Sequence, residues 1–158
     1  MVHLIAELSK YLMIILFAAY TFFSYSVLKH PVESERAQRI YHRQTACMFL
    51  IHLDAYIVIF VSTMEIKTLI FYAAQVAFVL FLFIIYKKIY KRAAQLIVNH
   101  MCMLMLIGFI ILTRLGFDSA VRQFEIGCIS AVITIFIPLL IRKMKALRRF
   151  TWFYAILG

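Results

Sequence analysis

Five long apolar stretches constrain what this chain can fold into more than any other feature of its sequence. Each is 18 or 19 residues long, and together they contain only two charged residues, Asp54 and Glu125. A helix needs about 20 apolar residues, with a range of roughly 17–25, to cross a bilayer. The sequence therefore predicts five complete transmembrane helices, which cover about Tyr11–Leu28, Thr45–Thr63, Thr68–Tyr86, Gln95–Thr113 and Phe124–Ile141.

The composition agrees with an all-α, polytopic membrane protein. Hydrophobic residues make up 65% of the 158-residue chain, whereas a soluble domain has about 45–50%. A domain of about 150 residues buries only about 70% of its surface, so a soluble core could not hide this excess. A cleavable signal peptide is an alternative for the first stretch, but such peptides usually have a positive start and a shorter apolar region. Here Lys10 is offset by Glu7, and the apolar run is long.

The polar segments between the apolar stretches define the expected connections. Residues 33–44 are expected to form a short surface helix, Met64–Lys67 a tight turn, and residues 114–123 a loop. A sixth helix is expected to start at Phe150. Its nine residues up to Gly158 are too few to cross a bilayer at about 1.5 Å per residue.

The basic residues predict the orientation of the helices in the membrane. Segments 29–44, 87–92 and 142–149 hold 13 of the 17 Lys and Arg residues. The remaining four, which fall at the other ends of the expected helices, are Lys10, Lys67, Arg114 and Arg122. Because cytoplasmic loops carry the excess of Lys and Arg, this alternation predicts an outside N-terminus and three cytoplasmic basic segments. The net charge of +10 is thus a topology signal, and no nucleic-acid partner is expected.

The stretch from Leu106 to Gly158 carries a family resemblance. It reads LIGFIILTRL at residues 106–115, AVRQF at 120–124, a basic segment at 142–149 and then Trp152-Phe153-Tyr154. This order of apolar helix, Arg122-Gln123 at the entry to a second helix, basic loop and aromatic-led third helix resembles the beginning of the SEDS family. That family comprises the RodA, FtsW and SpoVE cell-shape, division and sporulation proteins. The direction predicted for the fourth stretch, from inside to outside, matches that of the family's first helix.

The resemblance implies an activity and partners. Members of the family polymerise peptidoglycan from a lipid-linked disaccharide in the bacterial cytoplasmic membrane, with a penicillin-binding protein as partner. The implied organisation is a three-helix membrane module at residues 1–92, followed by the start of a SEDS-like domain at 93–158. The family's essential acidic residue lies in a later outer loop that these residues do not include. No catalytic residue is therefore assigned here, no cofactor is expected, and the 158-residue chain alone is expected to be inactive.

An alternative function is a small membrane transporter or a structural membrane protein centred on Asp54. A charged residue at the centre of a spanning helix costs about 2.5–3.5 kcal/mol on insertion scales, so it usually faces the bundle and has a partner. The structural interpretation pairs Asp54 with Gln75 on the next helix, and a proton path through Asp54 and His100 is the functional one. A metal site formed by His52, Asp54 and His100 is disfavoured, because residues 52 and 54 face different sides of a helix.

The remaining candidate residues are expected to contribute to the packing of the helices. Arg122 and Glu125 are one turn apart and could form an ion pair. Small-residue pairs would permit close helix contact, and they occur at Ala73/Ala77 and Gly127/Ala131. The three cysteines lie within apolar runs and are expected to be packing residues without a metal; they are Cys47, Cys102 and Cys128.

Overall fold

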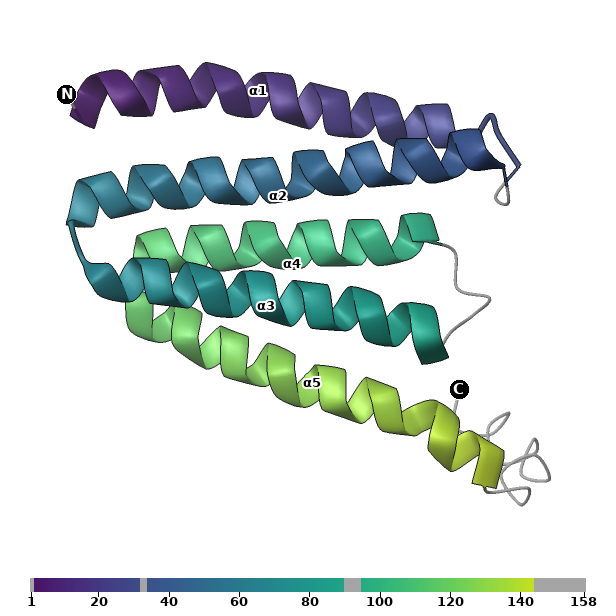
Figure 1. Cartoon of the computed structure of the whole chain (residues 1–158). Coiled ribbons are helices and arrows are strands. Elements are labelled where there is room, and N and C mark those ends of the chain that lie inside the picture. Colours follow the sequence, from purple (N-terminus) through teal and green to yellow (C-terminus); the bar gives the residue numbers. More distant parts are fainter. Residues whose placement is uncertain (1, 32–33, 90–94, 144–158) are drawn as a thin grey trace, which may run out of the picture.

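The computed structural model describes residues 2–31, 34–89 and 95–143 and contains five antiparallel helices (Figure 1). No strand occurs within these ranges. The helices are α1 (Val2–Val27), α2 (Glu35–Thr63), α3 (Ile66–Ile89), α4 (Gln95–Leu115) and α5 (Phe117–Lys143). All five are long and apolar enough to span a membrane. The predicted all-α polytopic class is therefore confirmed. The expected sixth helix at Phe150 lies outside the described residues.

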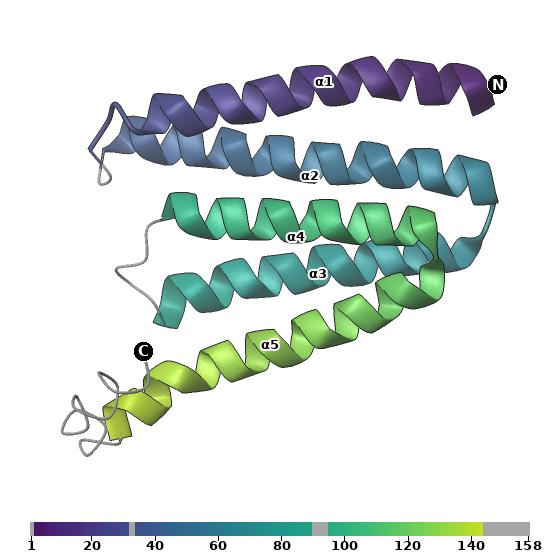
Figure 2. The same ribbon diagram turned by 180° about the vertical axis from the view of Figure 1, so that it is seen from behind.

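Helix α2 lies between α1 and the pair formed by α3 and α4. It packs along α1 on one side and against α3 and α4 on the other, while α5 packs against α3 and α4 (Figures 1 and 2). The main core cluster takes residues from four helices, including Tyr20 of α1, Met48 of α2, Val79 of α3 and Leu106 of α4. This core crosses the predicted boundary at residue 92, and the division into two domains stays a prediction.

Helix α2 begins earlier than the second apolar stretch. The Ser34 hydroxyl accepts a hydrogen bond from the Ala37 backbone N–H at 3.1 Å, which caps the first turn. From Glu35 to Thr63 there is neither glycine nor proline to interrupt the helix. The prediction of a separate surface helix over 33–44 is therefore wrong. These polar turns continue directly into the apolar part of α2.

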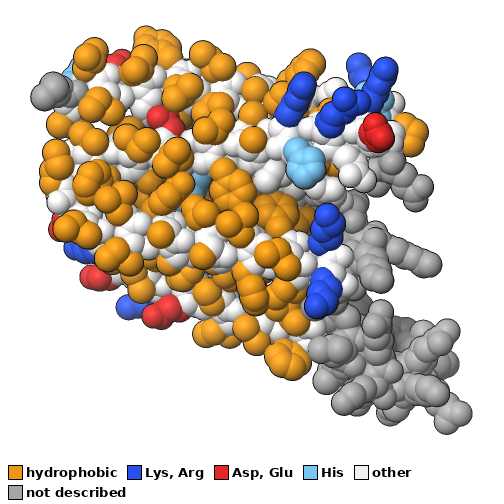
Figure 3. Space-filling view, in the orientation of Figure 1, with side chains coloured by type: hydrophobic (Ala, Val, Ile, Leu, Met, Phe, Trp, Pro, Cys, Tyr) orange, Lys and Arg blue, Asp and Glu red, His pale blue; other side chains and the backbone are white. Residues whose placement is uncertain are grey.

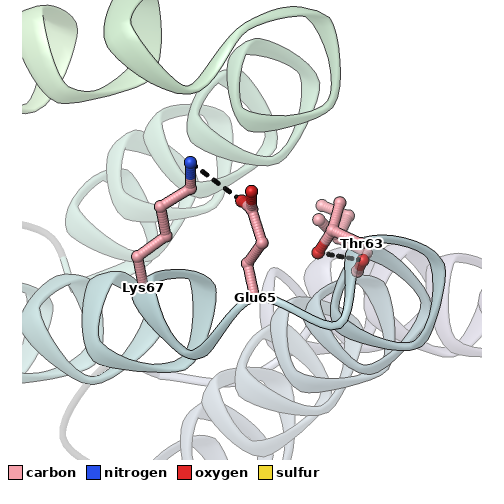
Figure 4. A network of polar contacts seen from close by, with 4 residues as sticks. Thr63, Glu65 and Lys67 are labelled. Atoms are coloured by element: carbon pink, nitrogen blue, oxygen red, sulfur yellow. Dashed lines mark hydrogen bonds and ion pairs between the residues drawn. The ribbon is translucent and has the colours of Figure 1, made fainter.

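Met64 and Glu65 form the turn between α2 and α3, which confirms the tight turn predicted at Met64–Lys67. Met64 has a φ of 53°, and its N–H donates to the Phe60 carbonyl at 2.7 Å. Beyond the turn, Lys67 Nζ lies 2.9 Å from Glu65 Oε2 (Figure 4). The same ammonium group lies 5.0 Å from the centre of the Phe117 ring on α5. The turn is thereby connected to the start of α5.

A single residue, Gly116, separates α4 from α5. Its N–H donates to the Leu112 carbonyl at 2.8 Å, and its own carbonyl accepts from the Ala120 N–H at 3.1 Å. One residue therefore completes the last turn of α4 and begins the first turn of α5. The loop predicted over residues 114–123 is wrong, because Phe117 to Gln123 are helical. The acidic Asp118 in the first turn of α5 favours this helix start.

The two ends of the bundle differ in charge (Figure 3). Among the described side chains, one end has six Lys or Arg and one acidic residue: Lys29, Arg36, Arg39, Arg43, Lys87, Lys88 and Glu35. The opposite end has equal numbers: Lys10, Lys67, Arg114, Arg122, Glu7, Glu65, Asp118 and Glu125. The antiparallel arrangement thus brings the basic segments 29–44 and 87–88 together at one end. The positive-inside rule would place this end in the cytoplasm.

The structure places the predicted packing residues in different environments. Cys47 and Cys102 are buried, Cys128 is half-buried, and all three are free thiols, as expected for packing residues. A Cβ added at Gly127 would meet the Phe109 ring at 3.6 Å, so α5 approaches α4 closely there. Ala73 and Ala77 are exposed on α3, and the close helix contact expected at this pair stays a prediction.

Candidate functional site: buried polar contacts between helices

His52 on α2 and Gln75 on α3 form one buried polar contact. His52 Nε2 lies 2.9 Å from Gln75 Oε1, and both side chains are fully buried. With this oxygen as the acceptor, the imidazole hydrogen is on Nε2. The His52 ring stacks on Tyr72 with centroids 5.0 Å apart and meets Tyr56 edge-on at 4.8 Å. His52 Nδ1 and Gln75 Nε2 have no hydrogen-bond partner among the described residues.

A hydroxyl pair joins α2 to α4 next to this contact. The Tyr56 hydroxyl lies 2.8 Å from Thr113 Oγ1, which donates to the Phe109 carbonyl at 2.7 Å. Threonine has one hydroxyl hydrogen, so the hydrogen between the two side chains comes from Tyr56. The direction of this short chain is therefore fixed, and it ends on the α4 backbone.

A second chain of polar contacts crosses three helices toward the basic end. Asn99 Nδ2 donates to Gln44 Oε1 at 2.7 Å, and Gln44 Nε2 donates to Ser24 Oγ at 2.8 Å. Ser24 Oγ in turn donates to the Tyr20 carbonyl at 2.9 Å. Asn99 and Gln44 are fully buried, and Asn99 Oδ1 has no partner among the described residues. The chain connects α4 through α2 to α1.

His100 lies beside this chain and contacts α1. Its Nδ1 shares a 3.1 Å hydrogen bond with the Tyr20 hydroxyl, and the two rings meet edge-on with centroids 5.7 Å apart. Tyr20 thus uses its hydroxyl for α4 and its carbonyl for Ser24 of its own helix. This hydrogen bond connects α1 directly to α4, whereas the chain through Gln44 connects them by way of α2.

Asp54 has a different partner from the one predicted. Ser9 Oγ on α1 donates to Asp54 Oδ2 at 2.6 Å, and Asp54 is half-buried. The prediction of an Asp54–Gln75 contact is wrong, because Gln75 is bonded to His52. Residues 52 and 54 are separated by about 200° around a helix. With His52 directed at α3, Asp54 therefore faces α1, as the predicted difference in helical face requires.

The polar candidates do not converge on one point. His52, Asp54 and His100 are bonded to Gln75, Ser9 and Tyr20, respectively. No hydrogen bond in the described ranges joins Asp54 to His100. Likewise, no group of three or more His, Cys, Asp or Glu side chains that could hold a metal ion occurs among the residues searched.

The predicted outer-loop residues lie in α5. Arg122 and Gln123 are exposed in its second turn, at the end of the bundle with balanced charge. Glu125 is also exposed, and within the described part of the chain no ion pair joins it to Arg122. The expected local ion pair is therefore not formed.

Most of the small polar partners could not be predicted from the sequence. Ser9, Ser24 and Thr113 lie in or near apolar runs, where isolated hydroxyls carry little signal. Gln44 falls in the segment predicted to form a surface helix, yet it lies in α2 and is fully buried. Gln44 lies eight residues before His52, which places the two about 80° apart around the helix and within one wide buried face. That spacing was a signal in the sequence that could have identified Gln44.

The fold and these contacts define a multi-pass α-helical membrane protein whose helices are joined by buried hydrogen bonds. Comparisons with protein-family models, with curated proteins and with solved structures found no match.

Proposed function

We propose that this chain is the N-terminal membrane region of a SEDS-type peptidoglycan glycosyltransferase in a bacterial cytoplasmic membrane. In this proposal the complete enzyme polymerises a lipid-linked disaccharide together with a penicillin-binding protein. The observation that supports it most is the α4–α5 hairpin. Its sequence carries the family-like pattern, with LIGFIILTRL in α4 and AVRQF in the first two turns of α5.

The charge distribution supports the same proposal. Helix α4 begins at the basic end of the bundle and ends at the balanced end, where Gly116 joins it to α5. With the basic end in the cytoplasm, α4 runs outward and α5 returns, as the first two helices of the SEDS family do. Arg122 and Gln123 then lie near the outer surface.

The buried contacts favour this proposal over a transporter centred on Asp54. A transport or proton path requires polar groups that connect along the bundle. Here each polar candidate is hydrogen-bonded to another helix, and among the described residues the one side-chain partner of Asp54 is Ser9. Interhelical hydrogen bonds of this kind contribute about 0.6 kcal/mol on average, with a maximum near 1.7. Such contacts stabilise a fixed arrangement of the helices.

The deciding experiment uses the complete reading frame that contains residues 1–158. Its product, purified and supplied with lipid-linked disaccharide and the partner encoded with it, is expected to form glycan polymer. Residues 1–158 alone are the control and are expected to form none. Polymer from this control, or a stop codon directly after Gly158, would contradict the proposal.

A further inference from the structure

Helix α2 exposes one continuous face that changes from basic to apolar along its length. Arg36, Arg39 and Arg43 are exposed in its first turns. Leu50, Leu53 and Ile57 follow on the same face and are 49%, 39% and 44% exposed. Residues 36, 43, 50 and 57 are spaced by seven, and a heptad drifts by only about 20° around a helix. Over the three heptads from Arg36 to Ile57 this drift adds up to about 60°, so the arginines and the apolar residues lie on one face that winds slowly around α2.

The three arginines are available to bind an anion. None forms an ion pair with another described residue. Glu35 is the one described carboxylate at this end of the bundle and lies one turn before Arg39, yet it forms no ion pair with that residue. His42 is exposed between Arg39 and Arg43 and adds no negative charge. Among the described side chains, the start of this face therefore has three arginines and one carboxylate, that of Glu35, which pairs with none of them.

The dimensions of the face correspond to one leaflet of a bilayer. From Arg43 to Ile57 the helix rises by about 21 Å at about 1.5 Å per residue, and half of a bilayer, with its headgroup region included, is about 20–22 Å thick. Arginine side chains are long, so their stems can lie along apolar surface while their guanidinium groups reach the lipid headgroups. Their planar guanidinium groups bind phosphate with two parallel hydrogen bonds.

We propose that this face of α2 is a binding site for an anionic phospholipid. Arg36, Arg39 and Arg43 bind the headgroup phosphate, and Leu50, Leu53 and Ile57 line the acyl chains. The occupant is a lipid because the basic half continues without interruption into an apolar half at membrane depth. The inference does not depend on the glycosyltransferase proposal.

The test measures which lipid contacts this face. Trp152→Phe removes the single tryptophan of the chain, and Leu50→Trp places a reporter on the apolar half. The protein is reconstituted in vesicles with equal phosphatidylglycerol and phosphatidylcholine, of which only one is brominated. Quenching by brominated phosphatidylglycerol is expected to exceed that by brominated phosphatidylcholine. The expected relative binding constant is at least about fivefold, since a basic residue near an anionic surface contributes about 1 kcal/mol.

Charge variants separate this site from a general surface charge. Arg36→Gln/Arg39→Gln/Arg43→Gln is expected to reduce the preference to near unity. The matched control Lys29→Gln/Lys87→Gln/Lys88→Gln removes the same amount of charge at the same end of the bundle. This control is expected to retain the preference for phosphatidylglycerol. Should the triple arginine variant fail to insert, Arg39→Gln alone is expected to lower the preference by about fivefold. Equal quenching by both lipids in the reporter protein, or equal losses in the arginine and lysine variants, would overturn the proposal.

Discussion

Asn99 Nδ2 on α4 donates a hydrogen bond to Gln44 Oε1 on α2 at 2.7 Å, and both side chains are fully buried. Asn99 lies beyond the predicted boundary at residue 92, and Gln44 lies before it. Helix α2 is therefore bonded to the region predicted as a second domain, 93–158, whether or not the first three helices form a separate module. This contact determines what can be expected when those helices are removed.

Deleting residues 1–86 from the complete protein tests the predicted module. The remainder starts with the basic segment 87–92 and an outward-directed helix, so it is expected to insert. It is also expected to retain some glycan polymerisation, because the proposed reaction centre lies downstream. Asn99 loses Gln44 in this variant, so Asn99→Leu is expected to raise its stability although it lowers that of the intact protein. A well-inserted deletion protein without polymerase activity would show that the first three helices are integral to the enzyme.

The orientation can be measured by cysteine labelling in a variant without the three native cysteines. Positions Ile66 and Ser119, which are exposed at the balanced end, are expected to react with an impermeant reagent from outside intact cells. Ser34, at the basic end, is expected to react only after the cells are opened. The same is expected of Ala146, which lies outside the described residues. Labelling at Ser34 in intact cells would reverse the orientation.

The Ser9–Asp54 contact predicts the effect of substitutions in α2. Asp54→Asn retains an acceptor for the Ser9 hydroxyl and is expected to leave the free energy of unfolding nearly unchanged. Asp54→Leu is expected to lower it by about 0.6 kcal/mol and by less than about 2 kcal/mol. Ser9→Ala in the Asp54→Leu background is expected to have little further effect, since the bond is already lost. Loss of a cellular activity in a folded Asp54→Asn protein would instead favour the transport function.

The His52–Gln75 contact predicts a coupling between α2 and α3. Each single change, His52→Leu or Gln75→Leu, leaves the other side chain buried without its partner. The double variant removes both polar groups, so its loss of stability is expected to be smaller than the sum of the two single losses. The expected coupling is about 0.6–1.7 kcal/mol in a double-mutant cycle on the free energy of unfolding. Additive losses would show that the contact contributes nothing.

The turn after α2 predicts a stabilising substitution. Met64 has a positive φ of 53°, a conformation that costs an L-residue with a side chain about 1–2 kcal/mol and costs glycine little. Met64→Gly is therefore expected to raise the free energy of unfolding by up to about 1 kcal/mol. The β-branched Met64→Val is expected to lower it. A lower stability for Met64→Gly than for Met64→Val would contradict this account of the turn.

Hydropathy and the spacing of the charges predicted the five spans, because a spanning helix needs about 20 predominantly apolar residues between polar ends. The same signals could not locate the helix ends. The polar turns at 35–44 and 117–123 are helical because they lack a breaker, although their composition resembles that of loops. To predict the partner of Asp54, one has to know how α2 is rotated about its own axis. That rotation is set by the packing of α2 against α1, α3 and α4 together. A single apolar run does not contain that information.

The Gly116 junction also has a consequence for how the protein enters the membrane. With one residue between them, α4 and α5 present no hydrophilic loop that must cross the bilayer by itself. The two helices can therefore leave the translocon together as a preformed helical hairpin. Met64 and Glu65 give α2 and α3 a similarly short connection at the same end. In the proposed orientation, a protease or an antibody outside the cell would find almost no loop of these helices to recognise.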